Sequence, residues 1–186
     1  MAKWGITYRG SKSRIAEKLL EVLPAGKRFV DLFGGGFAMS HAALASNKYQ
    51  SVLYNDADPL IVQLILEALR GNYDYSKFTP EFISRETFFR MRDTSGYVKY
   101  VWSFGGNGKD YSFGRDKEPF RRQCFEYAVS GGGAHITERR RCLHWLDREN
   151  GVRIGIEPLE RIERMQKLGL LSPAKTIARL NIGSVI

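Results

Sequence analysis

The first 75 residues contain apolar runs of strand length, separated by apolar positions at helical spacing. Residues 29–33 (FVDLF) and 51–55 (SVLYN) predict two strands, the first of them buried. Helical spacing predicts a helix over 11–23, which Pro24 ends, and a short apolar helix over 37–46. This alternation of strand and helix predicts an α/β fold with a parallel, doubly wound sheet.

A third helix is predicted directly after the second strand. Asp58 is a residue type that accepts hydrogen bonds at helix N-termini, and Pro59 occupies the first position of the helix, where proline is tolerated. Gly71 marks the expected end of this helix.

The pattern changes after about residue 72, and no clear alternation of strand and helix follows. Residues 102–115 (WSFGGNGKDYSFGR) predict a glycine-rich loop. The other predicted features are helix starts at Thr79-Pro80 and Asp116, helices over 136–150 and 157–168, and a late strand over 179–185. We therefore expect a cofactor-type α/β part at 1–75, a basic helical insert at 76–175 and a returning segment at 176–186.

Composition narrows the class of protein. The chain has 186 residues, of which 43% are hydrophobic, enough for one domain or for one domain with a small appendage. No apolar run reaches the length of about 20 residues that spans a bilayer, and the N-terminus lacks the apolar core of a signal peptide. Two cysteines, Cys124 and Cys142, fit a reducing compartment. A cytoplasmic location without a membrane partner is the expectation.

The positive charge is spread through segments that look ordered. The formal net charge is +9 and the pI is about 9.7. Aromatic residues lie among the arginines between residues 85 and 122, and this mixture suits nucleic acid, because phosphates attract arginine and bases stack on rings. The alternative is a basic surface around an aromatic core.

The three glycines of DLFGGGF follow the first predicted strand. Ligands of open α/β sheets lie outside the carboxyl ends of the strands, where Gly34 and Gly36 are expected. Asp56 follows the second strand about twenty residues later, where a carboxylate can accept hydrogen bonds from ribose hydroxyls. The two features together indicate a cofactor that contains adenosine. The alternative is a tight strand-to-helix turn without a ligand.

Two common nucleotide motifs do not fit. The dinucleotide pattern needs a third glycine where Met39 stands, which disfavours NAD and leaves S-adenosylmethionine open. The GGNGKD stretch is not an ATPase phosphate loop, because Ser103 and Asp110 occupy positions that need glycine and a hydroxyl residue.

A resemblance to a known family appears when the N-terminus is included. TYRGSK at 7–12 precedes a helix, and DLFGGGF follows about twenty residues after it. This order resembles the Dam-like class of DNA adenine-N6 methyltransferases, and the segment VWSFGGNGKDYSFGRD at 101–116 resembles the phage and prophage branch in particular. The resemblance covers nearly all of the chain.

The resemblance implies S-adenosylmethionine as cofactor and double-stranded DNA as partner. It implies a partial Rossmann-like methyltransferase sheet with a mainly helical target-recognition insert. The implied cofactor-binding residues are Tyr8, Gly10, Lys12, Asp31, Phe33, Gly34, Gly36 and Asp56. Tyr8 would lie against the adenosine or near the sulfonium. Lys12 would bind the cofactor carboxylate or hold the loop through backbone carbonyls, and Asp31 would accept from the cofactor amine.

The insert supplies the expected contacts to DNA. The candidates for base edges or phosphates are Arg115, Arg121, Arg122, Arg139, Arg140 and Arg141, and Asn107 and Lys109 of the glycine-rich loop would approach the target backbone. The alternatives are solvated helix faces and the tip of a surface hairpin. His135, Cys142 and His144 have incomplete ligand spacing, so no metal is expected.

The catalytic motif of the family, Asp/Asn-Pro-Pro-Tyr/Phe, does not occur in these 186 residues. The nearest stretches are ADPLI at 57–61, with one proline and no ring, and KEPF at 117–120, which has glutamate in place of Asp or Asn. Three explanations stand: a truncated product, one part of a split enzyme completed by a second chain, or a relative without catalysis. No catalytic residue is assigned, and the expectation is that this chain alone does not methylate DNA.

Overall fold

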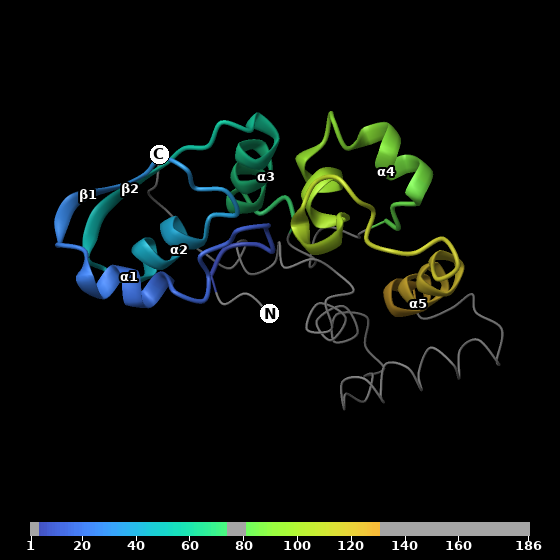
Figure 1. Cartoon of the computed structure of the whole chain (residues 1–186), viewed down its shortest axis with the longest axis horizontal. Helices are drawn as coiled ribbons and strands as arrows, with labels where there is room; N and C mark the ends of the chain where they lie inside the picture. The colour runs from blue at the N-terminus through green and yellow to red at the C-terminus, as the bar shows by residue number, and fades with distance from the viewer. Residues whose placement is uncertain (1–3, 74–80, 131–186) are drawn as a thin grey trace, which may run out of the picture.

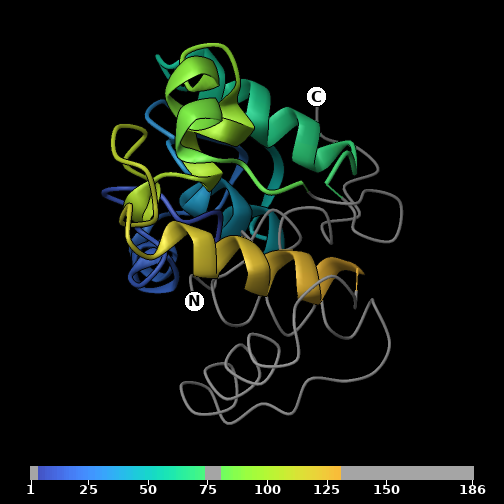
Figure 2. The ribbon, with the colours of Figure 1, turned by 90° about the vertical axis from the view of Figure 1, so that its right-hand side faces the viewer.

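The computed structural model describes residues 4–73 and 81–130, and side chains up to residue 126. Its elements are α1 (Ala16–Val22), β1 (Gly26–Asp31), α2 (Ala38–Ala45), β2 (Tyr49–Tyr54), α3 (Pro59–Leu69), α4 (Arg85–Met91), the π-helix η1 (Tyr97–Val101), the 3₁₀ turn η2 (Phe104–Gly106) and α5 (Glu118–Ser130). The strands lie at one end and α4 and α5 at the other, with α3 between them (Figure 1). Figure 2, viewed from the second end, shows α5 crossing the front.

The two predicted strands pair in parallel, which confirms that part of the prediction. The register runs from Gly26 opposite Tyr49 to Asp31 opposite Tyr54. In the described ranges the sheet has only these two strands, so the larger Rossmann-like sheet stays a prediction.

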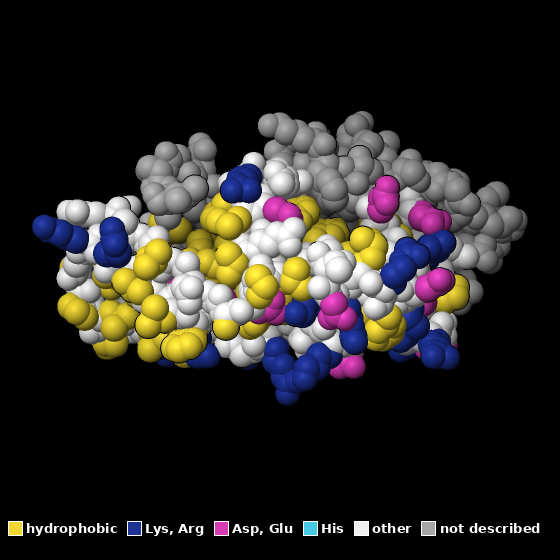
Figure 3. All heavy atoms as spheres, turned by 90° about the horizontal axis from the view of Figure 1, so that it is seen from above, with side chains coloured by type: hydrophobic (Ala, Val, Ile, Leu, Met, Phe, Trp, Pro, Cys, Tyr) yellow, Lys and Arg dark blue, Asp and Glu magenta, His cyan; other side chains and the backbone are white. Residues whose placement is uncertain are grey.

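The first strand was wrongly placed at 29–33. It begins at Gly26 and ends at Asp31, and Phe33 lies in the turn that follows, 89% exposed. It is also not buried on both faces. Phe29 packs with the cluster between α1 and α2, whereas Val30 points the other way and is half-exposed. Figure 3 shows hydrophobic side chains gathered over this end of the molecule.

The helix α1 starts later than predicted, because serine hydroxyls take backbone donors before it. The Oγ of Ser13 accepts from the N–H of Trp4 at 2.9 Å, and the Oγ of Ser11 accepts from the N–H of Ser13 at 3.3 Å. The bond between Ser11 and Ser13 is local and competes with helix formation, whereas the bond from Trp4 comes from nine residues away and holds Ser13 to the N-terminal segment. Residues 11–15 therefore form turns rather than the first part of a helix.

The prediction for α3 is confirmed at both ends. Asp58 is its N-cap, with Oδ1 accepting from the N–H of Leu60 at 2.9 Å, and Pro59 is its first residue. Gly71 follows the helix with a φ of +80°, a conformation that glycine adopts without strain.

The insert is helical where it is described. The sequence did not predict α4, whose N-cap Ser84 accepts from the N–H of Thr87 at 3.1 Å. The predicted start at Thr79-Pro80, the helices over 136–150 and 157–168 and the strand over 179–185 lie outside the described residues. The predicted start at Asp116 is confirmed to within two residues by α5. No helix in the described ranges is long and apolar enough to cross a membrane.

The core has three clusters of buried side chains. One lies between α1, α2 and the sheet, one surrounds α3, and one surrounds Phe88 and Trp102 in the insert. Tyr97 and Val101 of η1 pack against both of the last two clusters. The π-helix therefore joins the α/β part to the insert.

A buried histidine fastens the N-terminal segment to α2. The Nδ1 atom of His41 accepts a hydrogen bond from the N–H of Gly5 at 3.0 Å, and the imidazole packs edge-on against Trp4. His41 is 5% exposed, and burial lowers its pKa to about 4. Protonation of Nδ1 would remove the acceptor, so the neutral ring is the form that the fold requires.

We expect stability to fall as the pH drops from about 6.5 to about 4. The folded pKa of His41 lies below the unfolded value, so its contribution is complete above about pH 6.5 and is lost below it, amounting to about 3 kcal/mol. Urea unfolding across this range measures the loss. In His41→Asn an amide oxygen replaces Nδ1 and does not titrate, so its slope should be shallower. Equal slopes in the two proteins would contradict the assignment.

Candidate functional site

The glycine loop lies at the carboxyl end of the parallel strands, as predicted. After Asp31 the chain leaves the sheet, and the N–H of Gly34 donates to the carbonyl of Asn55 at 2.9 Å, just past β2. The loop is therefore tied to the end of the neighbouring strand. This is the edge at which open α/β sheets bind ligands.

Two tyrosines fill the space beside the glycines. A Cβ at Gly36 would lie 2.5 Å from the Cβ of Tyr8, and one at Gly35 would lie 2.9 Å from the Tyr8 ring. A Cβ at Gly34 would overlap the ring of Tyr54. Packing within the protein thus accounts for all three glycines, so the glycines alone do not establish a ligand.

The backbone of Gly35 is held on both sides. Its N–H donates to Oδ2 of Asp56 at 2.8 Å, and its carbonyl accepts from the hydroxyl of Tyr54 at 2.7 Å. The other oxygen of Asp56 accepts from the N–H of Asp58 at 3.0 Å. Each carboxylate oxygen of Asp56 has two lone pairs, so both can accept a further hydrogen bond.

The loop ends in a residue with unusual backbone geometry. Phe37, the N-cap of α2, has a φ of +68° although it is bulky and 2% exposed. Such conformations are costly and persist where the surroundings impose them. Here the N–H of Ile6 donates to the carbonyl of Gly36 at 2.8 Å, and the Phe37 ring packs edge-on against Tyr54.

Asp31 finds a partner within the protein. Its Oδ2 accepts from the N–H of Ser40 at 3.2 Å and from the Ser40 hydroxyl at 2.7 Å, near the N-terminus of α2. The sequence required a partner for this charge in an apolar run, and Ser40 supplies one. The predicted bond to a cofactor amine would have to use the other oxygen.

The remaining residues predicted to bind the cofactor are exposed: Gly10, Lys12 and Phe33. The ammonium of Lys12 donates to the carbonyl of Gly10 at 2.8 Å, within its own segment, so neither of its two predicted roles is tested by this bond. Gly10 has a φ of +84° and open space around its Cα. Phe33 is exposed beside the glycine loop.

Burial and nearby carboxylates raise the pKa of both tyrosines beside the loop. Burial raises the pKa of Tyr8, and the charge of Asp56 raises it further. The same two causes, in the same order, raise the pKa of Tyr54 strongly. Phenols are protonated at neutral pH even at their ordinary pKa, so both are hydrogen-bond donors there, and the shifts extend this state to higher pH.

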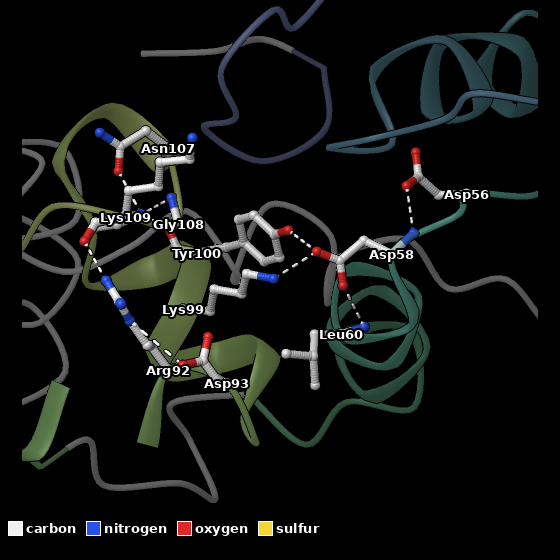
Figure 4. Close-up of polar contacts among 11 residues, drawn as sticks. Asp56, Asp58, Leu60, Arg92, Asp93, Lys99, Tyr100, Asn107, Gly108 and Lys109 are labelled. Atoms are coloured by element: carbon white, nitrogen blue, oxygen red, sulfur yellow. Dashed lines mark hydrogen bonds and ion pairs between the residues drawn. The ribbon is translucent and has the colours of Figure 1, made fainter. Parts of the chain in front are cut away.

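Asp58 connects the site to the insert, as Figure 4 shows. Its Oδ2 accepts from the ammonium of Lys99 at 2.7 Å and from the hydroxyl of Tyr100. Burial on its own would raise the pKa of Asp58, but the bonds from Lys99, Tyr100 and Leu60 outweigh it and lower the pKa. The carboxylate is therefore ionised at neutral pH.

The predicted glycine-rich loop is a tight hairpin against the N-terminal segment. Ser103 and Tyr111 form an antiparallel bridge, and the N–H of Arg9 donates to the carbonyl of Gly106 at 3.4 Å. Asn107 accepts from the N–H of Lys109 at 2.8 Å and so braces its own turn, while the Lys109 side chain is exposed. The hairpin alternative describes this geometry, and contact with DNA stays a prediction.

The arginines predicted to contact DNA are partly engaged within the protein. Arg121 lies over the ring of Phe113, and Arg122 lies over that of Phe82 and 4.0 Å from Glu126. Arg115 is exposed. The predicted candidates outside the described residues are Arg139, Arg140 and Arg141.

Most aromatics among the arginines are core residues. Phe88, Trp102 and Tyr111 are buried in one cluster, so for these three rings the alternative of an aromatic core is confirmed. Phe104 and Phe89 are 68% and 46% exposed. In the described ranges, no three His, Cys, Asp or Glu side chains gather closely enough to hold a metal ion.

Three functional candidates were missed at the level of sequence. Tyr54 lies two residues before Asp56, and Asp58 was assigned only as a helix cap. Tyr100 lies 5.3 Å from Tyr8 between ring centroids, although the two are far apart in the chain. Nothing in a periodic pattern pairs them.

Comparison with known proteins gives one match. A family model described as D12 class N6 adenine-specific DNA methyltransferase matches residues 8–122. The matched range begins at Tyr8 and includes the glycine loop, Asp56 and the hairpin at 103–111. No curated protein and no solved structure matches the chain.

We expect Gly36→Ala to destabilise the fold by about 1–3 kcal/mol, because the new methyl group would press on Tyr8 and on the carbonyl of Ile6. The matched control is Gly26→Ala, where nothing lies within 4 Å of the added carbon. Thermal melting of both variants measures the difference. If the two melt alike, the close packing of Tyr8 on the loop is refuted.

Proposed function

Because the chain belongs to the D12 class N6 adenine-specific DNA methyltransferase family, we propose that it supplies the cofactor-binding and DNA-recognition portion of such an enzyme. S-adenosylmethionine would donate the methyl group to the N6 atom of adenine in a short double-stranded site. One observation carries the proposal: the glycine loop and Asp56 meet at the carboxyl end of two parallel strands, inside the matched range.

The cofactor assignment is supported by groups with capacity left for a ligand. Asp56 accepts one hydrogen bond at each oxygen and can take ribose hydroxyls with its other lone pairs. The exposed ring of Phe33 offers an apolar surface beside the loop for a base. Tyr8 lies against Gly35 and Gly36, and its ring would meet the adenosine or the sulfonium beside the loop.

Three further residues near the loop offer the cofactor a hydrogen-bonding group or space. Lys12, which now holds the carbonyl of Gly10, has two further N–H donors for a carboxylate. Asp31 has one oxygen without a bond to Ser40 for the cofactor amine. Gly10 leaves open space for close approach.

The proposed DNA face is the insert. The net charge of +9 favours a polyanion, and Lys109 and Arg115 are exposed there. Asn107 lies in the same hairpin, and Arg121 and Arg122, which stack on protein rings, stand beside it as candidates for phosphate contacts. The segment at 101–116 supports placing the chain in the phage branch of the family.

The catalytic step needs residues that this sequence does not contain. An Asp/Asn-Pro-Pro-Tyr/Phe motif binds the adenine amino group in the resembling family, and no such motif occurs in the 186 residues. We therefore propose that another polypeptide segment, in a longer protein or a second chain, completes the enzyme. The absent motif also favours a second candidate, a DNA-binding relative without catalysis. Methyl transfer from labelled cofactor by this chain alone would exclude both readings.

For the cofactor, calorimetry should show binding of S-adenosylmethionine and none of NAD. Asp56→Ala should weaken the binding at least about tenfold, because it removes the acceptors for the ribose. The control is Asp93→Ala, an exposed carboxylate remote from the loop. The folded fraction of each variant is checked by circular dichroism at the binding temperature. Unchanged affinity in folded Asp56→Ala would refute the ribose assignment.

For DNA, the affinity for a duplex should fall steeply with salt, because each phosphate contact releases counterions. Fluorescence anisotropy at several salt concentrations gives the slope of log K against log salt. Lys109→Ala should reduce that slope by about 1, whereas Lys27→Ala, on the exposed end of β1, should leave it unchanged. Absent or salt-independent binding would count against the insert as a DNA face.

A further inference from the structure

We propose that Lys99 and Tyr100 of η1 are positioning residues for the cofactor loop, acting through Asp58 and Tyr8. The inference rests on the proposed function above, because it concerns how that cofactor site is held. The two residues belong to the insert, so the site would be completed by the segment expected to contact DNA.

The first step is the shared carboxylate. Oδ2 of Asp58 accepts from the ammonium of Lys99 at 2.7 Å and from the hydroxyl of Tyr100 (Figure 4). The Lys99 and Asp58 side chains are only 21% and 26% exposed. Charge-assisted bonds in such partly buried places are stronger than surface ion pairs, so they can fix the carboxylate.

The second step runs from Asp58 to the glycine loop. The N–H of Asp58 donates to Asp56 at 3.0 Å, and Asp56 accepts from the N–H of Gly35 at 2.8 Å. The position of Asp58 thus sets the turn that carries Asp56. A displaced Asp58 would shift both the proposed ribose acceptor and the loop that it holds.

A second route reaches the same loop through the rings. Tyr100 is 6% exposed and packs against Tyr8, with 5.3 Å between ring centroids and a 45° tilt. The ring of Tyr8 in turn covers Gly35. The hydrogen-bonded route and the packed route both begin at Tyr100 and meet at Gly35.

The π-helix explains how neighbours in sequence reach one oxygen. The wider turn of a π-helix brings consecutive side chains closer around the axis than an α-helix does, and such turns are frequent at functional sites. Close packing fixes its start, because a Cβ at Gly96 would overlap the carbonyl of Leu60 at the beginning of α3. At the other end the chain enters the hairpin at 103–111, whose Gly106 would meet the carbonyl of Thr7 if it carried a Cβ.

The test compares affinities for S-adenosylmethionine in the full chain by calorimetry. Tyr100→Phe keeps the ring on Tyr8 and removes the bond to Asp58, and Lys99→Met removes the charge while keeping most of the stem. We expect each to weaken binding about tenfold. Lys99→Arg, which preserves the charge, should restore most of the affinity. Tyr49→Phe is the matched control, because its hydroxyl donates to the carbonyl of Pro24, away from the loop.

The outcomes separate this inference from the function on which it rests. Positioning predicts weaker binding at a temperature where melting curves show the variants folded, whereas a purely structural role would lower the melting temperature alone. If the unaltered chain binds and both Tyr100→Phe and Lys99→Met bind equally well, the inference is overturned and the proposed function stands. If the unaltered chain does not bind the cofactor, the proposed function itself fails.

Discussion

The carboxylate of Asp56 is the constraint on which the described site depends. One oxygen holds the glycine loop through Gly35, and the other holds the turn into α3 through Asp58. The loop after β1 and the helix after β2 are thereby fixed to each other at the end of the sheet. Tyr54, from the last position of β2, closes the arrangement by donating to the carbonyl of Gly35.

Around this carboxylate the two parts of the molecule form a single packed body. The cluster around α3 includes Tyr100 from the insert and Ile6 from the N-terminal segment, and η1 packs on the cores of both parts. Segments from three regions of the sequence therefore surround the glycine loop. A division into a cofactor part and a recognition part describes the order of the chain better than it describes the packing.

The sequence correctly predicted the elements that depend on residues close together in the chain. The α3 helix follows from Asp58, Pro59 and Gly71, each of which acts within one turn, and the parallel pair follows from two apolar runs. The late start of α1 was not predictable, because it depends on the bond from the N–H of Trp4 to Ser13. The position of Asp56 beside the loop was predictable, since carboxyl ends of parallel strands share an edge.

What the sequence could not supply were contacts between distant segments. The approach of Tyr8 to the glycines and to Tyr100 has no periodic signal. The same limit left two interpretations of the aromatics open, because rings between arginines look alike in sequence whether they face solvent or pack around Phe88. The exposure of Val30 on the outward face of β1 likewise depends on what packs against that face rather than on the residues of the strand.

The π-helix at 97–101 makes the site sensitive to the loss of a single residue in related sequences. A π-turn holds one residue more than an α-turn, so loss of a single codon there would restore regular α geometry. Consecutive residues would then stand about 100° apart around the axis, so a lysine and a tyrosine in succession would point further from each other. When relatives are aligned, a one-position gap at this place would therefore mark two groups of sequences. One group keeps a lysine and a tyrosine that bind the same carboxylate, and the other holds the turn before α3 in another way.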